Sequence, residues 1–343
     1  MAVVLSTSSP RLVPLGRRRL LLSATALLAG CATEAAPPGP RMAAPILTDD
    51  AFILSDGARL PLRTWFPDGS PRVVVLALHG FNDSRDAWEI PAPDFADAGM
   101  AVYAPDQRGF GDAPGRGLWP GSEALTDDAA EMVGLLRARH PNAPLVLMGE
   151  SMGGAVLMRL AVRPDAPEVA GYVLVAPAVW GRARMNIFMR TGLWLASNLL
   201  PGMEVSRPPP PVQVYASDNR SALIRLSHDP LTILSTRMDT LNGLVDLMDS
   251  ALAAAARFTA RALFMYGAHD ELVPKEATLA TWRALPPGPH TLAYYRDGWH
   301  LLLRDLDREV PIGDIIAWVR APGLPLPSGA DRVARDWLAG QQA

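Results

Sequence analysis

Six short apolar runs constrain the fold more than any other feature of this sequence. The runs are Val73–Leu78, Met100–Ala104, Leu145–Met148, Tyr172–Val175, Ala262–Tyr266 and Thr291–Tyr295. Their apolar residues follow one another without alternating polar ones, which is typical of parallel strands buried on both faces of a sheet. Helical patterns lie between the runs, for example over 122–140. This alternation predicts an α/β fold with a mostly parallel, doubly wound sheet.

The start of the sheet is predicted to be antiparallel. Two apolar-rich runs, Ala51–Leu54 and Leu60–Phe66, flank the dipeptide Asp56-Gly57. An Asp-Gly pair between two such runs is among the strongest short-range signals for a β-hairpin. We therefore expect an antiparallel hairpin before the first parallel strand.

The interval 178–257 interrupts the alternation, because it carries no strand signal. It contains an apolar, helix-prone stretch, Met185–Leu200, and two further helical patterns, Ser217–Leu226 and Thr236–Ala256. So long an interval within a compact sheet is expected to be functional. We predict a helical lid over the carboxyl ends of the strands, where ligands bind in such sheets.

Four apolar lid residues are candidates for contact with a substrate: Met185, Phe188, Met189 and Trp194. Such side chains suit the lining of an acyl channel or contact with a membrane surface. The alternative is that the same face packs onto the sheet domain. The sequence leaves both interpretations open.

The N-terminus has the pattern of a secretory signal. Three arginines, Arg17 to Arg19, precede the apolar run Leu20–Ala29. A positive region followed by a short apolar region is typical of signal peptides. The run is too short to span a bilayer, which needs about 20 apolar residues. The alternative is an ordinary N-terminal helix of a cytoplasmic protein.

Cys31 is the only cysteine, which excludes an intrachain disulfide and any site that needs several cysteines. It ends the tetrapeptide Leu28-Ala29-Gly30-Cys31, which resembles a bacterial lipobox. In such sequences the cysteine becomes the first mature residue and carries the lipid, and a following residue other than Asp favours the outer membrane. We predict an exported, membrane-anchored lipoprotein on the periplasmic face of the outer membrane. A periplasmic or secreted protein is the alternative.

These signals divide the 343 residues into four parts. They are a signal peptide, 1–30; a linker with the lipidated Cys31, 31–48; an α/β core, 49–177 and 258–343; and the lid, 178–257. The net charge is −3, from 32 basic and 35 acidic residues, so no basic field is present to attract nucleic acid. The expected partners are a small ester or lipid substrate and a membrane surface, and no nucleic acid.

The predicted nucleophile is Ser151. The apolar run Leu145–Met148 leads into the sequence Gly-Glu-Ser-Met-Gly-Gly over 149–154, and a helical pattern follows. A Gly-x-Ser-x-Gly motif between a buried strand and a helix is the setting of a nucleophile elbow. The glycines are needed because a side chain would clash in so tight a turn, and the strained turn exposes the serine hydroxyl.

An elbow serine needs a general base and an orienting acid, which follow it in the order acid, then histidine. His290 opens the last predicted strand, whereas His300 lies on the loop after that strand, so His300 is the predicted base. Asp270 follows the run Ala262–Tyr266 and is the predicted acid, with Glu271 and Asp297 as competitors.

The oxyanion of the reaction requires two backbone N–H donors. The first is expected from Met152, directly after the nucleophile. The second is expected from Phe81, in the loop after Val73–Leu78, where Gly80 lets the chain turn inward and His79 is structural. The sequence has no histidine pair, carboxylate cluster or Gly-rich phosphate loop, so we expect neither a metal nor a cofactor.

These motifs resemble those of the monoacylglycerol lipase and lysophospholipase branch of the α/β-hydrolases, the serine aminopeptidase S33 type. The matching segments are His79-Gly80-Phe81, 106–111, 149–154, 267–274 and 298–302. The resemblance implies an α/β-hydrolase fold, the triad Ser151, Asp270 and His300, and the oxyanion donors Phe81 and Met152.

Two further implications concern residues near these motifs. Asp106 and Arg108 match a family segment that we interpret as architectural. Family members commonly have His where this chain has Glu150, at a position expected to face away from the chemistry. A carboxylate beside the nucleophile would nevertheless be able to alter its electrostatics.

The predicted function is hydrolysis of carboxylic esters of lipid-like substrates, a monoacylglycerol or a lysophospholipid, through an acyl-enzyme. An acyltransferase on the same triad, or a non-catalytic membrane-tethered binding lipoprotein, is an alternative. A serine aminopeptidase is a third, and would need an acidic pocket for the substrate amine. The lid carboxylates available for such a pocket are Glu204, Asp218, Asp239, Asp246 and Asp249.

Overall fold

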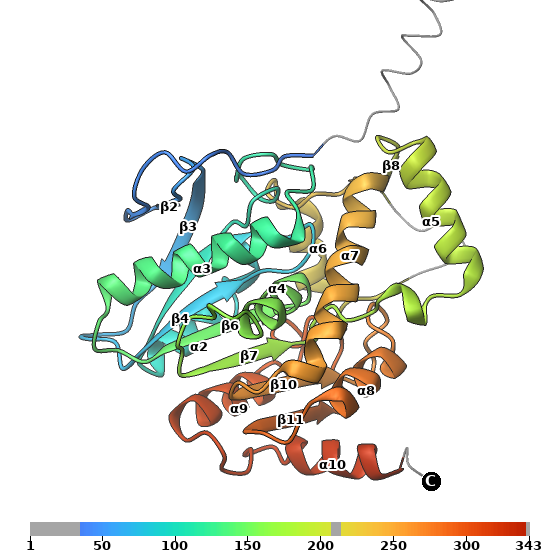
Figure 1. The fold of residues 1–343 in the computed structure, drawn as a ribbon. Coiled ribbons are helices and arrows are strands. Elements are labelled where there is room, and N and C mark those ends of the chain that lie inside the picture. Colours follow the sequence, from blue (N-terminus) through green and yellow to red (C-terminus); the bar gives the residue numbers. More distant parts are fainter. Residues whose placement is uncertain (1–34, 207–213, 341–343) are drawn as a thin grey trace, which may run out of the picture.

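A nine-stranded sheet forms the centre of the computed structural model, which describes residues 35–206 and 214–340 (Figure 1). The strand order is β1-β2-β3-β5-β4-β6-β7-β10-β11. The strands are β1 (Ile46–Leu47), β2 (Ala51–Ile53), β3 (Arg59–Trp65), β4 (Val73–Leu78), β5 (Met100–Pro105), β6 (Leu145–Glu150), β7 (Gly171–Val175), β10 (Ala262–Gly267) and β11 (His290–Tyr295). The signal peptide and Cys31 lie outside the described residues.

The pairing of the strands confirms the predicted fold class. β2 and β3 form the expected antiparallel hairpin, and β3 also pairs antiparallel with β5. From β5 through β4, β6, β7 and β10 to β11, neighbouring strands are parallel. Each of the six apolar runs forms one of these parallel strands, because a strand covered by helices on both faces has no solvent-facing positions.

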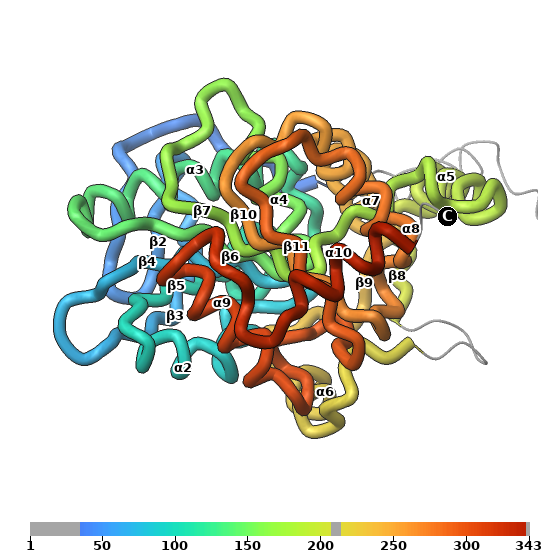
Figure 2. The backbone as a smooth tube through the Cα atoms, turned by 90° about the horizontal axis from the view of Figure 1, so that it is seen from below, coloured from blue at the N-terminus to red at the C-terminus, as the bar shows by residue number. Residues whose placement is uncertain are grey.

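Helices cover both faces of the sheet. Figure 2 shows α3 (Ser122–Arg139) and α4 (Met152–Ala161) on one side of the strands, and α2 (Ala92–Asp97) and α9 (Glu309–Arg320) on the other. The remaining helices are η1 (Arg85–Trp88), η2 (Arg182–Arg184), α5 (Ile187–Leu199), α6 (Arg220–His228), α7 (Met238–Ala254), η3 (Ala255–Arg257), α8 (Lys275–Ala284) and α10 (Ala330–Gly340).

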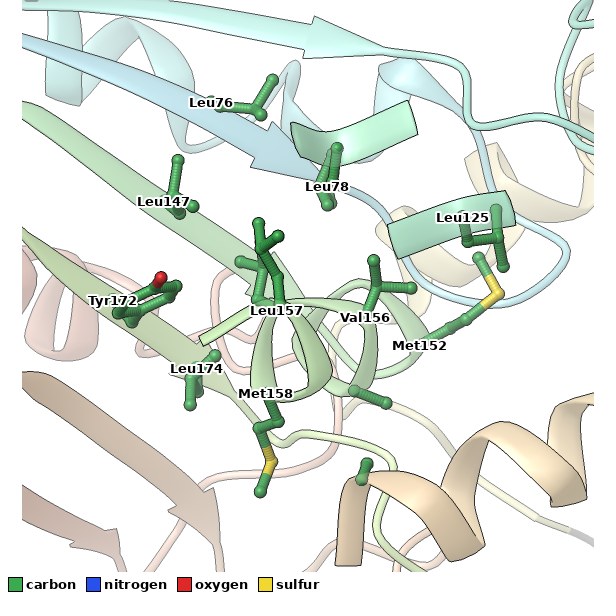
Figure 3. Close-up of a cluster of buried hydrophobic side chains, with 14 of the residues drawn as sticks. Leu76, Leu78, Leu125, Leu147, Met152, Val156, Leu157, Met158, Tyr172 and Leu174 are labelled. Atoms are coloured by element: carbon green, nitrogen blue, oxygen red, sulfur yellow. The ribbon is translucent and has the colours of Figure 1, made fainter. Parts of the chain in front are cut away.

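α4 connects the core to the predicted nucleophile, because its first residue follows Ser151 directly. Its residue Leu157 is fully buried and belongs to the same core cluster as Leu147, Tyr172 and Leu174 of β6 and β7 (Figure 3). Burial of a leucine of this kind contributes roughly 1.5–3 kcal/mol to the stability of the fold. The position of Ser151 is therefore fixed by the main hydrophobic core.

The predicted lid interval, 178–257, divides into two parts in the structure. α7 packs on α4, and its residues Val245, Leu247 and Ala251 belong to the core cluster, so this helix is part of the layer over the sheet. α5, by contrast, buries only Ser197 and lies to one side of the sheet domain (Figure 1). The interval 178–257 thus contains both a helix of the core layer and a helix beside it, and an apolar helical pattern alone does not reveal which layer a helix covers.

The interval also contains two short strands that the sequence did not predict. β8 (Glu204–Val205) and β9 (Thr236–Arg237) pair antiparallel. Strands of two residues are too short to carry an alternating or continuous apolar pattern.

The described part of the predicted linker lies along the sheet domain. Ala35 forms a β-bridge with Trp119, and the N–H of Gly39 donates to Oδ2 of Asp56 at 3.0 Å. Arg41 forms an ion pair with Glu131 at 2.9 Å. Within residues 35–206 and 214–340, none of the helices has the length and apolarity needed to cross a membrane.

Candidate active site

Ser151 occupies the turn between β6 and α4. Its φ of +50° lies in the left-handed region that non-glycine residues rarely adopt. A Cβ on Gly149 would lie 2.5 Å from the carbonyl carbon of Gly153, and a Cβ on Gly153 would lie 2.2 Å from the oxygen of Leu78. Because only glycine fits at these two positions, the motif forms the strained strand–turn–helix expected of a nucleophile elbow.

Asp270 and His300 are hydrogen-bonded to each other. Nδ1 of His300 donates to Oδ2 of Asp270 at 2.8 Å, and both side chains are buried. The other carboxylate oxygen of Asp270 accepts the N–H groups of Leu272 and Val273, each at 2.8 Å. These bonds fix the carboxylate. Nε2 is the ring nitrogen of His300 that is not bonded to Asp270, and His300 lines a cavity.

The pKa of His300 is raised above its ordinary value. Burial alone would lower it, but the carboxylates of Asp270 and Glu150 stabilise the protonated imidazole more than burial and Arg304 destabilise it. A raised pKa makes the imidazole a stronger base, as proton abstraction from a serine requires.

The predicted oxyanion donors are the backbone N–H groups of Phe81 and Met152. Among the hydrogen bonds of the described residues, none uses the N–H of Phe81 or of Met152. Met152 is the first residue of α4, where helical N–H groups have no intrahelical acceptor. Gly80 approaches the nucleophile closely, since a Cβ placed there would lie 3.4 Å from Cβ of Ser151.

Ser151 and His300 line the same cavity, which has a volume of about 820 Å³. The hydroxyl of Ser151 makes no hydrogen bond with the imidazole in the described residues, and such bonds are often long in enzymes without substrate. Most of the cavity wall is apolar. It includes Met185, Met189, Leu193, Leu241, Leu244 and Met248 from η2, α5 and α7 and the segments beside them.

The four candidate lid residues do not all lie in this wall. Met185 and Met189 line the cavity, whereas Phe188 is 85% exposed and Trp194 is 61% exposed, and neither lines it. The reason is helical geometry: Met189 and Leu193 are four residues apart and share the inner face of α5, and Phe188 lies on another face.

The lid is joined to the loop that carries His300. The N–H of Leu301 donates to the oxygen of Ala216 at 2.9 Å. Asp305 accepts the hydroxyl of Ser217 at 2.6 Å and the N–H of Trp299 at 2.8 Å. Burial raises the pKa of Asp305 to about 6. These bonds hold the loop on both sides of the histidine.

The two competitors for the acid have other contacts. Glu271 lines the cavity and accepts the N–H of Tyr215 at 2.7 Å. Asp297 is exposed and does not line the cavity. His79 is fully buried and binds Gln107 and Gly80 through its two ring nitrogens. In the described part of the chain, no group of three or more His, Cys, Asp or Glu side chains is arranged to hold a metal ion.

Comparison with known proteins identifies the family. Residues 69–307, more than half of the chain, match the family model described as serine aminopeptidase, S33. The chain belongs to the serine aminopeptidase S33 family. Monoacylglycerol lipase of Mycolicibacterium smegmatis is 27% identical over 282 residues, which cover 79% of this chain and 96% of the relative. Monoglyceride lipase of Rattus norvegicus is 25% identical over 260 residues, which cover 74% of this chain and 84% of the relative.

Solved structures have the same fold. Monoacylglycerol lipase of Paleococcus ferrophilus superposes with a TM-score of 0.63 at 24% identity, covering 76% of this chain and 98% of that one. A soluble variant of monoglyceride lipase from Saccharomyces cerevisiae, in complex with a substrate analog, superposes with a TM-score of 0.66 at 19% identity. The superposition covers 82% of this chain and 98% of that one. At these identities the likeness concerns the fold, which is that of the α/β-hydrolases.

The five lid carboxylates considered for an amine pocket do not line the cavity of this S33 family member. Asp246 and Asp249 pair with Arg182, at 2.6 Å and 2.7 Å. Asp239 pairs with Arg237, Asp218 accepts the N–H of Leu306, and Glu204 accepts the hydroxyl of Ser235. The amine pocket proposed from the sequence is therefore wrong in these residues, because each is bonded to another group of the protein outside the cavity wall.

Glu150 does not face away from the chemistry, so that expectation is wrong. Its carboxylate lines the cavity, and a Cβ on Gly80 would lie 4.0 Å from its Oε2. Nη2 of Arg304 bonds Oε2 of Glu150 at 2.5 Å and Oδ2 of Asp83 at 2.8 Å. Sequence reasoning missed Asp83 and Arg304. The available signal was an arginine that directly follows three leucines, four residues after His300.

Proposed function

We propose that this protein cleaves carboxylic esters of lipid-like substrates, a monoacylglycerol or a lysophospholipid, through a triad of Ser151, Asp270 and His300. The enzyme class predicted from the sequence, a carboxylic ester hydrolase, is confirmed by the named relatives. The observation that carries the triad is the shared cavity: a strained serine and a histidine bonded to a buried aspartate line one apolar chamber of about 820 Å³.

The proposed mechanism is two-step acyl transfer. Nε2 of His300 takes the proton of Ser151, whose Oγ attacks the ester carbonyl carbon. The N–H groups of Phe81 and Met152 stabilise the resulting oxyanion. The bond to the alcohol breaks, and the alcohol leaves with the proton from His300. A water molecule, deprotonated by His300, then attacks the acyl carbon and releases the acid, and Ser151 recovers its proton.

The apolar cavity wall supports a lipid-like acyl chain. The chamber is lined by methionine and leucine side chains from the lid and α7, which suit a flexible alkyl chain better than a peptide. The monoacylglycerol lipases among the relatives act on substrates of this kind according to their names.

The location of the enzyme is a second part of the proposal. We propose export and lipid attachment at Cys31, which would hold the enzyme at the periplasmic face of the outer membrane. The support is the sequence from Arg17 to Cys31 alone. A Cys31→Ser variant is expected to leave the membrane fraction of cells that express the full chain, and unchanged partition would contradict lipidation.

One experiment tests the catalytic proposal. A fluorophosphonate probe should label the wild-type enzyme and fail to label a folded Ser151→Ala variant. The same preparation is then given monoacylglycerols and lysophospholipids of increasing chain length, p-nitrophenyl esters and aminoacyl amides. We expect turnover of the esters to rise with chain length. Faster turnover of the amides would favour an aminopeptidase, and an excess of acyl transfer to added alcohol over hydrolysis would favour an acyltransferase.

A further inference from the structure

Asp83, Glu150 and Arg304 form a buried charged cluster beside the nucleophile. Each is between 3% and 6% exposed. Nη2 of Arg304 bonds both carboxylates, at 2.5 Å to Glu150 and 2.8 Å to Asp83. All three residues line the cavity that contains Ser151 and His300. The part of the wall that these charged residues form is the polar end of the cavity.

With Asp83 as a carboxylate, the cluster has no net positive charge. Burial raises the pKa of Glu150 above its ordinary value, whereas the adjacent Arg304 lowers it. If Glu150 is ionised, the cluster carries one excess negative charge. If Glu150 is protonated, Asp83 still cancels the charge of Arg304. Glu271, on the same cavity wall, adds a further carboxylate.

The cluster also offers an unused hydrogen-bond donor. Nε of Arg304 is buried and has no hydrogen-bond partner among the described residues. A buried donor without a partner is unfavourable, so a bound group that accepts a hydrogen bond from it is favoured. Neutral hydroxyl oxygens accept such a bond, and hydroxyl groups can at the same time donate to the carboxylates.

The rest of the cavity determines which part of an ester meets the cluster. Side chains of the lid and of α7 make the remaining wall apolar. An acyl chain is therefore expected to lie against this part of the wall. With the carbonyl carbon at Ser151 and the acyl chain in the apolar part, the alcohol part of the ester lies at the polar end.

We propose that Asp83, Glu150 and Arg304 select the alcohol part of the substrate by charge, accepting uncharged polyol esters and rejecting esters that carry a phosphate monoester. This inference rests on the proposed ester hydrolysis. A phosphate finds no uncompensated cation at the polar end, and the nearby carboxylates repel it in a medium of low dielectric constant.

The test compares head groups at constant acyl chain. Mono-octanoylglycerol, octanoyl lysophosphatidylcholine and octanoyl lysophosphatidic acid are hydrolysed below their critical micelle concentrations, with p-nitrophenyl octanoate as a measure of the chemistry alone. For the wild type we expect kcat/KM to be at least about tenfold lower for the phosphate monoester than for mono-octanoylglycerol. Equal values for these two substrates would overturn the proposal.

Two substitutions locate the selectivity. Asp83→Asn should raise the relative kcat/KM for the phosphate monoester severalfold whatever the protonation state of Glu150, because it removes a carboxylate that balances Arg304. The double variant Asp83→Asn/Glu150→Gln leaves the guanidinium uncompensated and should raise it further. Asp56→Asn is the control, because Asp56 is a partner of the buried Arg108 and neither residue lines the cavity. It should leave the ratio of kcat/KM between the phosphate monoester and mono-octanoylglycerol unchanged.

If the variants change kcat/KM for all four substrates by the same factor, the cluster is merely structural and the proposal is contradicted. If the double variant fails to fold, the wild-type ratio and Asp83→Asn still decide the question. Failure of the proposed function has a different signature, since the wild type would then neither label with fluorophosphonate nor hydrolyse p-nitrophenyl octanoate.

Discussion

Two buried arginines have similar partners but different surroundings. Arg108 bonds Asp128 through Nε and Nη2, at 2.8 Å and 2.9 Å, and Asp56 through Nη1 at 2.8 Å. Arg304 bonds its two carboxylates through Nη2 alone, and its Nε has no partner among the described residues. Arg108 therefore uses its whole guanidinium within the fold, whereas Arg304, a residue of the cavity wall, leaves its buried Nε without a partner among the described residues.

The difference separates an architectural cluster from a functional one. A buried ion pair whose hydrogen bonds are all satisfied holds segments together, here the loop after β5, the β2–β3 turn and α3. Its neighbour Asp106, bonded to Arg85, ties the same loop to η1. A charged cluster with an unsatisfied donor and access to a cavity is instead available to a ligand. Substitutions at the Arg108 cluster should therefore lower stability, whereas substitutions at the Arg304 cluster should change activity toward the substrate.

The largest effect is expected at the proposed nucleophile. Ser151→Ala should lower kcat for a p-nitrophenyl ester by at least about 10⁴-fold, because the covalent step is lost. The thermal midpoint should change little, since alanine removes only a hydroxyl that makes no hydrogen bond with His300. Retained turnover in a purified, folded variant would mean that another residue is the nucleophile.

The orienting acid should come next. Asp270→Asn should lower kcat by up to about 10⁴-fold, because an amide neither stabilises the protonated imidazole nor holds its tautomer. Glu271→Gln is a matched control on the neighbouring residue, and its effect on kcat should be far smaller. If the two variants lost the same activity, the identity of the acid would have to be reconsidered.

The architectural arginine should affect stability instead of turnover. Arg108→Met leaves Asp56 and Asp128 buried without a cation, which should lower the free energy of unfolding by about 3–5 kcal/mol. Denaturant titration measures this loss, and kcat per labelled active site should remain near that of the wild type. A large fall in kcat for the folded fraction would remove the distinction between the two arginines.

The sequence predicted the sheet more completely than the cavity. Apolar runs such as Val73–Leu78 report their burial directly, so β4 begins and ends where the run does. Ser151, Asp270 and His300 could be chosen because each follows a strand, and strand ends meet at one edge of the sheet.

The cavity wall depends on contacts between distant segments. Asp83 and Arg304 meet although they are far apart in the chain, and no periodic pattern encodes such a contact. The expected orientation of Glu150 is wrong for the same reason, since its partner Arg304 lies 154 positions away in the chain. The division between α5 and α7 likewise depends on which neighbour covers each apolar face, and a helical pattern does not specify the neighbour.

The smallest predicted effect concerns pH. His300 must be neutral to accept the proton of Ser151, so kcat/KM should fall as the pH drops through its pKa, which lies above the ordinary value of 6.5. The groups that set it are Asp270 and Glu150, which raise it, and Arg304, which lowers it along with burial. Glu150→Gln removes one of the raising charges, so the acid limb of the profile should move to lower pH. Asp56→Asn should leave the limb in place, because Asp56 belongs to the Arg108 cluster. An unmoved limb in Glu150→Gln, with the protein folded, would mean that Glu150 places no charge at His300, and the contrast between the two arginines would then concern the bound substrate alone.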